Sequence, residues 1–199
     1  MNTEILVITD RSGSMSNIAN DVIGGYNKFI EEQKKEEGEC RVTFTQFDNC
    51  YEVVYIGKDI KDVPPLTSLT YVPRGGTALL DAIGITFNAQ GKRIAEEKWA
   101  DLVVVVIITD GEENSSHEYT NDQIKVMTKH AEDHGWELVF LAANQDAFTV
   151  SQNLGMSGKL SGTYTASAAG TQSLYSATSM SVSSLRKGEK LDGLKGVIL

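Results

Sequence analysis

The sequence contains few cysteines, few prolines and fewer basic than acidic side chains. Two of its 199 residues are cysteines. It has 18 Lys and Arg residues and 27 Asp and Glu residues, which give a net charge of −9. No dense cluster of basic residues is present, which argues against nucleic acid as a partner. Cys40 and Cys50 bracket a stretch typical of a hairpin and would lie at different heights along it, so we expect both thiols to stay reduced.

A long hydrophobic run is also missing. The longest apolar run, residues 102–108, has about a third of the ~20 residues that a membrane-spanning helix needs. The N-terminus carries Glu4 and only a short apolar stretch, without the basic start of a secretion signal. We therefore predict no membrane contact and a cytoplasmic location, in a prokaryotic or phage protein.

The composition is that of an ordinary globular protein. Hydrophobic residues make up 41% and charged residues 23% of the chain, both near the averages for such proteins. A length of 199 residues suits one hydrophobic core, since single domains commonly have ~100–200 residues. We predict one domain over residues 1–188, followed by a C-terminal tail over residues 189–199 that frays.

Hydrophobic patterning predicts strands that alternate with helices. Residues 4–9 and 102–109 are mostly apolar, with Glu4, Thr9 and Thr109 as the exceptions, as in central strands of a parallel sheet that is covered on both faces. Residues 41–47 and 51–56 alternate, as in an antiparallel hairpin. Further strands are predicted at 136–142 and 159–164, and helices that begin near Asn17, Thr77, Asn121, Phe148 and Thr171. Because parallel strands need crossover helices, we predict an α/β fold: a doubly wound, mostly parallel six-stranded sheet with one antiparallel edge strand and helices on both faces.

Two stretches are less regular. Residues 58–76 hold all three prolines and no apolar period, which predicts a long connection over the surface. Residues 157–184 are rich in Ser, Thr, Ala and Gly, a composition that a low-complexity linker would also have. Apolar residues at helical spacing, and the basic pair Arg186-Lys187, favour a terminal helix over about 171–187 instead.

Two predicted strands are followed at once by an aspartate. Asp10 follows the first strand and Asp110 follows the strand ending at Thr109. In doubly wound sheets, ligands bind outside the carboxyl ends of the strands, where the strand order reverses. If these two strands are neighbours at that reversal, the two carboxylates converge.

The loop after the first strand offers further oxygen atoms. Asp10, Ser12 and Ser14 alternate along it, and Gly13 permits a tight backbone path between them. Hydroxyls and one or two carboxylates are the ligands that a hard cation such as Mg²⁺ prefers. An ordinary polar turn, with a serine as helix cap, is the alternative for this loop taken alone.

Together with Thr77 in Gly-Gly-Thr and Asp110 in Thr-Asp-Gly, the Asp-x-Ser-x-Ser loop resembles the metal-ion-dependent adhesion site of von Willebrand factor A domains. The resemblance covers roughly residues 3–187 and implies their Rossmann-like fold. It implies that Ser12, Ser14 and Thr77 contact the ion directly, and that Asp10 and Asp110 bind it directly or through water. The implied cofactor is Mg²⁺, with Mn²⁺ or Ca²⁺ as alternatives, and an open coordination position would accept a carboxylate from another protein.

Further candidate residues lie outside the five proposed ligands. Four are predicted to follow strands near the same edge and could form a rim that contacts the partner, although a solvated polar rim is the simpler interpretation: Glu112, Glu113, Asn144 and Asp146. His130 and His134 have the i, i+4 spacing that can bind zinc on a helix. They lack a third ligand in the sequence, so we expect surface histidines.

These features favour a metal-dependent protein-binding module that is not an enzyme. The resemblance implies partners such as an AAA+ ATPase of the MoxR type or a multi-subunit assembly. One alternative is an assembly subunit that uses its terminal helix for contact. The other is a Mg²⁺-dependent phosphoryl-transfer enzyme with Asp10 as nucleophile. Enzymes of the haloacid dehalogenase kind have Asp-x-Asp, whereas this chain has Ser12 at the second position.

Overall fold

The computed structural model describes residues 1–143, 146–165 and 167–195. In this part of the chain six strands form one sheet, in the order β3-β2-β1-β4-β5-β6, and every neighbouring pair is parallel except β2 and β3. The strands are β1 (Thr3–Asp10), β2 (Cys40–Phe47), β3 (Tyr51–Asp59), β4 (Leu102–Thr109), β5 (Trp136–Ala143) and β6 (Leu160–Tyr164). The predicted fold class, with its antiparallel edge strand, is confirmed.

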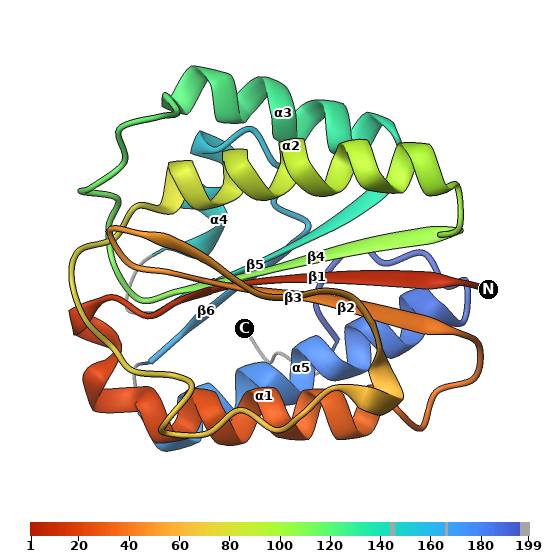
Figure 1. The fold of residues 1–199 in the computed structure, drawn as a ribbon, viewed down its shortest axis with the longest axis horizontal. Coiled ribbons are helices and arrows are strands. Elements are labelled where there is room, and N and C mark those ends of the chain that lie inside the picture. Colours follow the sequence, from red (N-terminus) through yellow and green to blue (C-terminus); the bar gives the residue numbers. More distant parts are fainter. Residues whose placement is uncertain (144–145, 166, 196–199) are drawn as a thin grey trace.

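Helices cover both faces of the sheet (Figure 1). One layer contains α1 (Ala19–Gln33) and α5 (Ala168–Arg186), and the other contains α2 (Leu79–Glu97), α3 (Asn121–Asp133) and α4 (Ala147–Asn153). Alternate side chains of β1 lie on opposite faces of the sheet: Ile5 and Val7 pack with α1 and α5, whereas Leu6 and Ile8 pack with α2 and α3. Burial on both faces explains why the middle of each central strand is apolar at consecutive positions.

Three predicted helix starts are wrong. Helix α5 begins at Ala168, three residues before the predicted start at Thr171. Thr77 lies before α2, which begins at Leu79, because its backbone is bonded to a distant loop: its N–H donates to Asn114 Oδ1 (2.9 Å) and its carbonyl accepts the N–H of Asn114 (3.0 Å). Asn17 does not cap α1. It lies in a short 3-10 helix, Gly13–Ile18, whose Met15 and Ile18 are buried in the core.

The stretch 58–76 is only partly a surface connection, which corrects the prediction. Strand β3 continues to Asp59 and is followed by a 3-10 helix, Ile60–Asp62. Four apolar side chains of this stretch are buried in the core on the side of the sheet that α1 and α5 cover: Ile60, Val63, Leu66 and Tyr71. Their irregular spacing gave no period by which the sequence could reveal them.

The C-terminal segment folds back toward α5 as far as the structure describes it. Leu191 and Leu194 pack against the core on the α1 and α5 side. The N–H of Lys195 donates to Ser181 Oγ on α5 (2.8 Å). The domain boundary at residue 188 stays a prediction. Cys40 and Cys50 are free thiols, and no helix in the described part of the chain has the length and apolar character needed to cross a membrane.

The packing of α1 against α5 leads to a prediction that uses two adjacent glycines. A methyl group at Gly25 would overlap the ring of Tyr175 on α5, whereas one at Gly24 would meet nothing within 4 Å. We expect Gly25→Ala to lower the free energy of unfolding by about 1–3 kcal/mol through overpacking. Gly24→Ala should raise it by about 0.5–1 kcal/mol, because alanine favours the helix. Urea unfolding of both variants checks this, and equal shifts would show that α5 does not pack here.

Candidate metal-binding site

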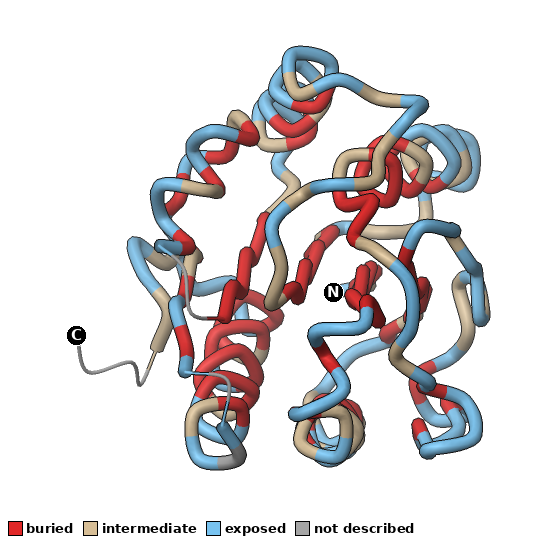
Figure 2. The backbone as a smooth tube through the Cα atoms, turned by 90° about the vertical axis from the view of Figure 1, so that its left-hand side faces the viewer, coloured by how far each residue is buried: buried red, intermediate tan, exposed pale blue. Residues whose placement is uncertain are grey.

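Strands β1 and β4 are hydrogen-bonded neighbours at the point where the strand order reverses. Thr9 of β1 lies opposite Ile108 of β4, so the two strands end at the same edge of the sheet. Figure 2 shows the molecule from this edge, with the buried strands between the two helix layers. Asp10 and Asp110 therefore leave the sheet side by side, as predicted for neighbouring strands.

Hydroxyl groups link the loop after β1 to the loop after β4. Ser12 Oγ and Ser14 Oγ lie 3.0 Å apart, at hydrogen-bond distance. The Ser14 hydroxyl donates to Asp110 Oδ1 (2.6 Å). Three of the five predicted ligands thus form one continuous hydrogen-bonded chain.

Asp10 is the buried anchor of the site. Its side chain has no solvent exposure, its Oδ1 accepts the N–H of Ser12 (2.6 Å) and its Oδ2 accepts the hydroxyl of Thr109 (2.6 Å). The Tyr71 hydroxyl holds the backbone carbonyl of Asp10 (2.6 Å). The carboxylate is therefore fixed in place by its neighbours, and its orientation does not depend on solvent.

Thr77 reaches the same point from a third loop. The N–H of Gly13 donates to the carbonyl of Gly75 (3.1 Å), which joins the loop before Thr77 to the loop after β1. A Cβ atom at Gly111 would lie 3.0 Å from Thr77 Oγ1 and 3.5 Å from Ser14 Oγ. The two hydroxyls and the loop beginning at Asp110 therefore surround a common point.

Glycine is required where this third loop approaches. Gly75 has φ +68°, a conformation that L side chains rarely adopt, and a Cβ there would overlap the Asn49 side chain. At Gly76 a Cβ would overlap the hydroxyl of Ser115. The Gly-Gly pair thus lets the chain pass between two other loops and deliver Thr77.

The two carboxylates have no basic partner. Neither Asp10 nor Asp110 forms an ion pair with a lysine or arginine among the residues that the structure describes. Burial raises the pKa of Asp10 to about 6, against the opposing hydrogen bonds from Thr109 and Ser12, and burial also raises the pKa of Asp110. Two poorly solvated acids side by side are the arrangement that a bound cation would stabilise.

The donor set fits a hard divalent cation. Two carboxylates and three hydroxyls supply oxygen only, which suits Mg²⁺, Mn²⁺ or Ca²⁺ better than a soft metal. Asp10, Ser12 and Thr77 are buried, whereas Ser14 is exposed and Asp110 partly so. An ion held here would be enclosed on the protein side and accessible on the other.

The predicted rim residues differ in what they contact. Glu113 is engaged within the chain: its carboxylate accepts the N–H groups of Ser115 and Ser116 and that of Leu80 in the first turn of α2. Asp146 caps α4: its carboxylate accepts the hydroxyl of Thr149 (2.6 Å) and the N–H groups of Thr149 and Phe148, and these bonds lower the pKa of Asp146. Glu112 is exposed, and Asn144 lies outside the described residues.

Sequence reasoning missed a buried ion-pair network behind the site. Asp48, 1% exposed, accepts from Arg11 Nε (3.1 Å) and Arg74 Nε (2.8 Å) through one oxygen. Arg11, which lies between Asp10 and Ser12, also pairs with Glu52 (2.8 Å). The network ties the loop after β1 to the β2–β3 turn and to the loop before Thr77.

Two more residues that support the site went unrecognised. Thr109, which bonds Asp10, was read only as the end of a strand, although its position just before Asp110 placed it at the site. Asn114, which holds the backbone of Thr77, gave no signal, because its partner is 37 residues away in the sequence.

Comparison with known proteins supports the fold. No family model and no curated protein matches the sequence. Proximal thread matrix protein 1 from the mussel byssus, solved with a zinc-occupied MIDAS motif, has a TM-score of 0.66 at 16% identity, over 92% of this chain and 46% of that chain. The pilus adhesin SpaC from Lactobacillus rhamnosus GG has a TM-score of 0.68 at 16% identity, over 92% and 31%. Manganese-loaded TRAP from Plasmodium vivax has 0.62 at 18% identity, over 82% and 68%.

These likenesses concern the fold. The chain has the Rossmann-like fold of von Willebrand factor A domains, with five parallel strands and one antiparallel strand in its described part. It spans about half the length of the mussel protein and less than a third of the pilus adhesin.

Proposed function

We propose that the chain is a noncatalytic module that binds a partner protein through a divalent cation. Asp10, Ser12, Ser14, Thr77 and Asp110 would hold the ion, and Mg²⁺ is the proposed occupant. The observation that carries the proposal is the convergence of these side chains from three loops, linked by the Ser12–Ser14–Asp110 hydrogen bonds. The zinc and manganese named for the mussel and Plasmodium structures agree with a site for divalent ions.

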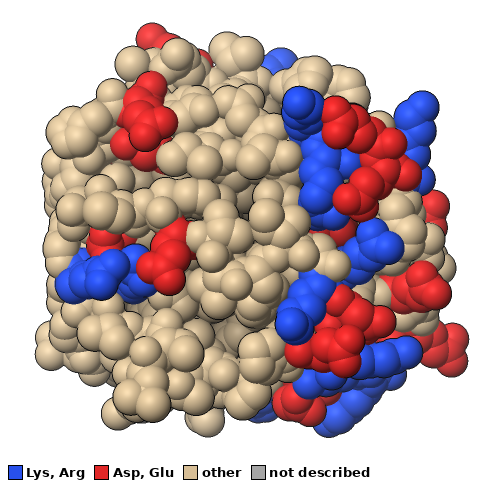
Figure 3. All heavy atoms as spheres, viewed as in Figure 1, with Lys and Arg blue, Asp and Glu red and all other residues tan. Residues whose placement is uncertain are grey.

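A carboxylate is the proposed partner group. When bound, the ion would supply positive charge beside Asp10 and Asp110, which form no ion pair with a lysine or arginine in the described part of the chain, because the nearby Arg11 and Arg74 pair with Asp48 instead. On the face in Figure 3 charged side chains gather at the opposite end of the sheet, where the parallel strands start, and are sparse at the site end. The cation would therefore dominate the local field and draw an acidic side chain to the exposed side near Ser14 and Asp110.

The enzyme alternative has less support. A nucleophilic Asp10 needs a free oxygen that faces the substrate. Both oxygens of Asp10 accept hydrogen bonds, and its side chain is fully buried. This arrangement suits a residue that positions a cation rather than one that attacks a phosphoryl group.

Partner capture tests the proposal. We expect the immobilised chain to retain a host protein in buffer with Mg²⁺ or Mn²⁺ and to release it on chelation, because the bridging ion is removed. The released protein is then identified, and an AAA+ ATPase or a subunit of a larger assembly is the predicted kind. Retention that chelation leaves unchanged would contradict an ion-bridged contact and favour an assembly subunit.

The hydroxyl of Thr109 allows a further prediction. Thr109→Val removes the bond that orients Asp10 and keeps the shape of the side chain, so we expect Mn²⁺ to bind the purified chain ~10–100-fold more weakly. Thr9→Val is the matched control, since the buried Thr9 hydroxyl has no hydrogen-bond partner in the described structure. Isothermal titration measures both. A Thr109 variant that binds Mn²⁺ as tightly as the Thr9 variant would contradict this role.

A further inference from the structure

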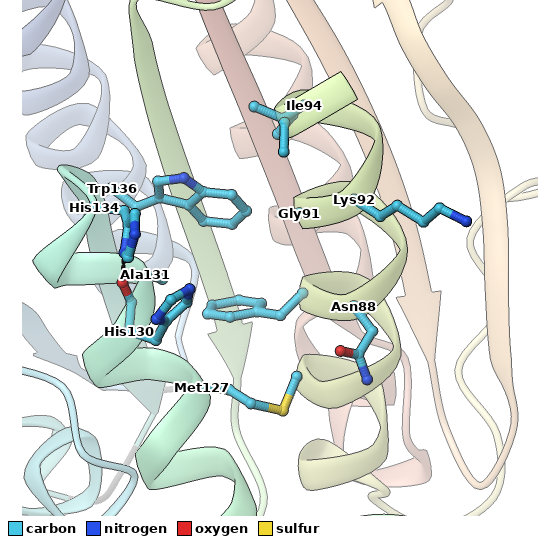
Figure 4. A pocket seen from close by; sticks show the side chains of 11 residues that line it. Asn88, Gly91, Lys92, Ile94, Met127, His130, Ala131, His134 and Trp136 are labelled. Atoms are coloured by element: carbon cyan, nitrogen blue, oxygen red, sulfur yellow. Dashed lines mark hydrogen bonds between the residues drawn. The ribbon is translucent and has the colours of Figure 1, made fainter. Parts of the chain in front are cut away.

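A pocket lies between α2 and α3, away from the strand ends that carry the candidate site (Figure 4). Its volume is about 530 Å³. Its walls are largely apolar, with Phe87 and Ile94 from α2, Met127 from α3 and Trp136 from the start of β5. His130 of α3 and His134, the C-cap of that helix, complete one side.

The two imidazoles lie next to each other. Their ring centroids are 4.1 Å apart, with an angle of 45° between the ring planes. Two nitrogen atoms that share a metal ion must lie within about 4.2 Å, because each bond is ~2.0–2.1 Å long. Both histidines are exposed, so a small rotation of the His130 side chain would bring one of its nitrogens to an ion held by His134.

One of the two rings is already oriented as a ligand. His134 Nδ1 lies 2.8 Å from the backbone carbonyl of His130. A carbonyl oxygen only accepts hydrogen bonds, so Nδ1 is the donor, and in the neutral ring Nε2 is then the nitrogen with the free lone pair. Metal-binding histidines usually donate their other ring N–H in this way, which fixes both the tautomer and the orientation of the ring.

The position in the helix also favours a cation. His130 lies in the last turn of α3 and His134 follows it as the C-cap. The carbonyl end of a helix carries partial negative charge, which attracts positive ions. Imidazole nitrogen is a borderline ligand that suits Cu²⁺, Ni²⁺ and Zn²⁺ better than Mg²⁺.

We propose that His130 and His134 form a second metal site, specific for a borderline transition-metal ion and independent of the oxygen site at the strand ends. The spacing alone predicted surface histidines. The adjacent rings and the hydrogen bond of His134 Nδ1 add information on ring position and orientation, which the spacing cannot give. In the described part of the chain no three His, Cys, Asp or Glu side chains converge, so water would complete the coordination.

Tryptophan emission gives a local readout. The chain has two tryptophans, and Trp136 lines the same pocket as the histidines. In a Trp99→Phe background Trp136 is the remaining emitter, and Cu²⁺ quenches tryptophan at short range. Titration of the purified chain with CuCl₂, in excess Mg²⁺ to occupy the oxygen site, should give quenching that saturates at one equivalent.

Variants decide whether the histidines are responsible. We expect His130→Asn and His134→Asn each to weaken Cu²⁺ binding by about 10-fold or more, as loss of one of two ligands implies. His117→Asn, at the third histidine of the chain, should leave it unchanged. Quenching that fails to saturate, or that persists unaltered in the double variant His130→Asn/His134→Asn, would overturn the proposal. Asp110→Ala should not alter Cu²⁺ quenching, which separates this site from the proposed function.

Discussion

Asp110→Ala is expected to lower the affinity of the purified chain for Mn²⁺ by about 100-fold or more. Loss of an outer-shell partner alone weakens metal binding by ~10–100-fold, and Asp110 is one of only two carboxylates in the proposed site. Its carboxylate also accepts the Ser14 hydroxyl (2.6 Å), so the substitution loosens a second proposed ligand. Titration calorimetry with Mn²⁺ measures the change without knowledge of the partner.

Glu112→Ala is the matched control for this prediction. Glu112 lies two residues further along the same loop, is exposed, and is not part of the hydrogen-bonded cluster. The Glu112→Ala substitution removes the same charge as Asp110→Ala. It should lower the Mn²⁺ affinity only slightly, because an exposed carboxylate attracts a distant ion weakly. Equal losses in the two variants would mean that the general negative charge of the edge, and not a defined site, attracts the ion.

The second large effect is expected from Asp48, which contacts no proposed ligand directly. Asp48→Ala leaves the buried Arg11 with only the partly exposed Glu52 as its ion-pair partner. Removing one member of a buried ion pair commonly destabilises a protein by ~3–5 kcal/mol, and Glu52 should keep the loss near about 3 kcal/mol. Urea unfolding in chelator measures it, because bound metal would otherwise add to the stability of the folded chain.

Arg74→Ala is the comparison for Asp48→Ala. Arg74 bonds the same carboxylate, but its side chain is 59% exposed, and exposed ion pairs contribute little. We expect a much smaller shift of the urea midpoint than for Asp48→Ala. If the two variants unfold at the same urea concentration, the buried Arg11–Asp48 pair is not the contact that holds these loops together.

The strands and the candidate site could be predicted because both depend on local pattern and chain order. A run such as residues 102–109, apolar at every position before Thr109, has few structural alternatives to a central parallel strand. Once β1 and β4 are neighbours, Asp10 and Asp110 must lie close together, since Asp10 ends β1 and Asp110 directly follows β4. The convergence of these two carboxylates could therefore be inferred without knowledge of any side-chain contact.

The parts that escaped prediction depend on contacts between distant residues. Thr77 appeared to open a helix, but Asn114 binds its backbone and delays α2 by two residues. Arg11 looked like a spacer between two ligands, and Asp48 looked like a turn residue, although each buries its charge against the other. Such pairs leave no local pattern, because each residue type is common in the loop where it occurs.

A crystal structure of the chain grown with Mn²⁺ tests the central claim most directly, since anomalous scattering locates the ion without reference to any partner. The account predicts a single strong anomalous peak at the carboxyl ends of β1 and β4, within bonding distance of the hydroxyl oxygens of Ser12, Ser14 and Thr77. The absence of a peak at these strand ends, with Mn²⁺ at saturating concentration, would contradict it.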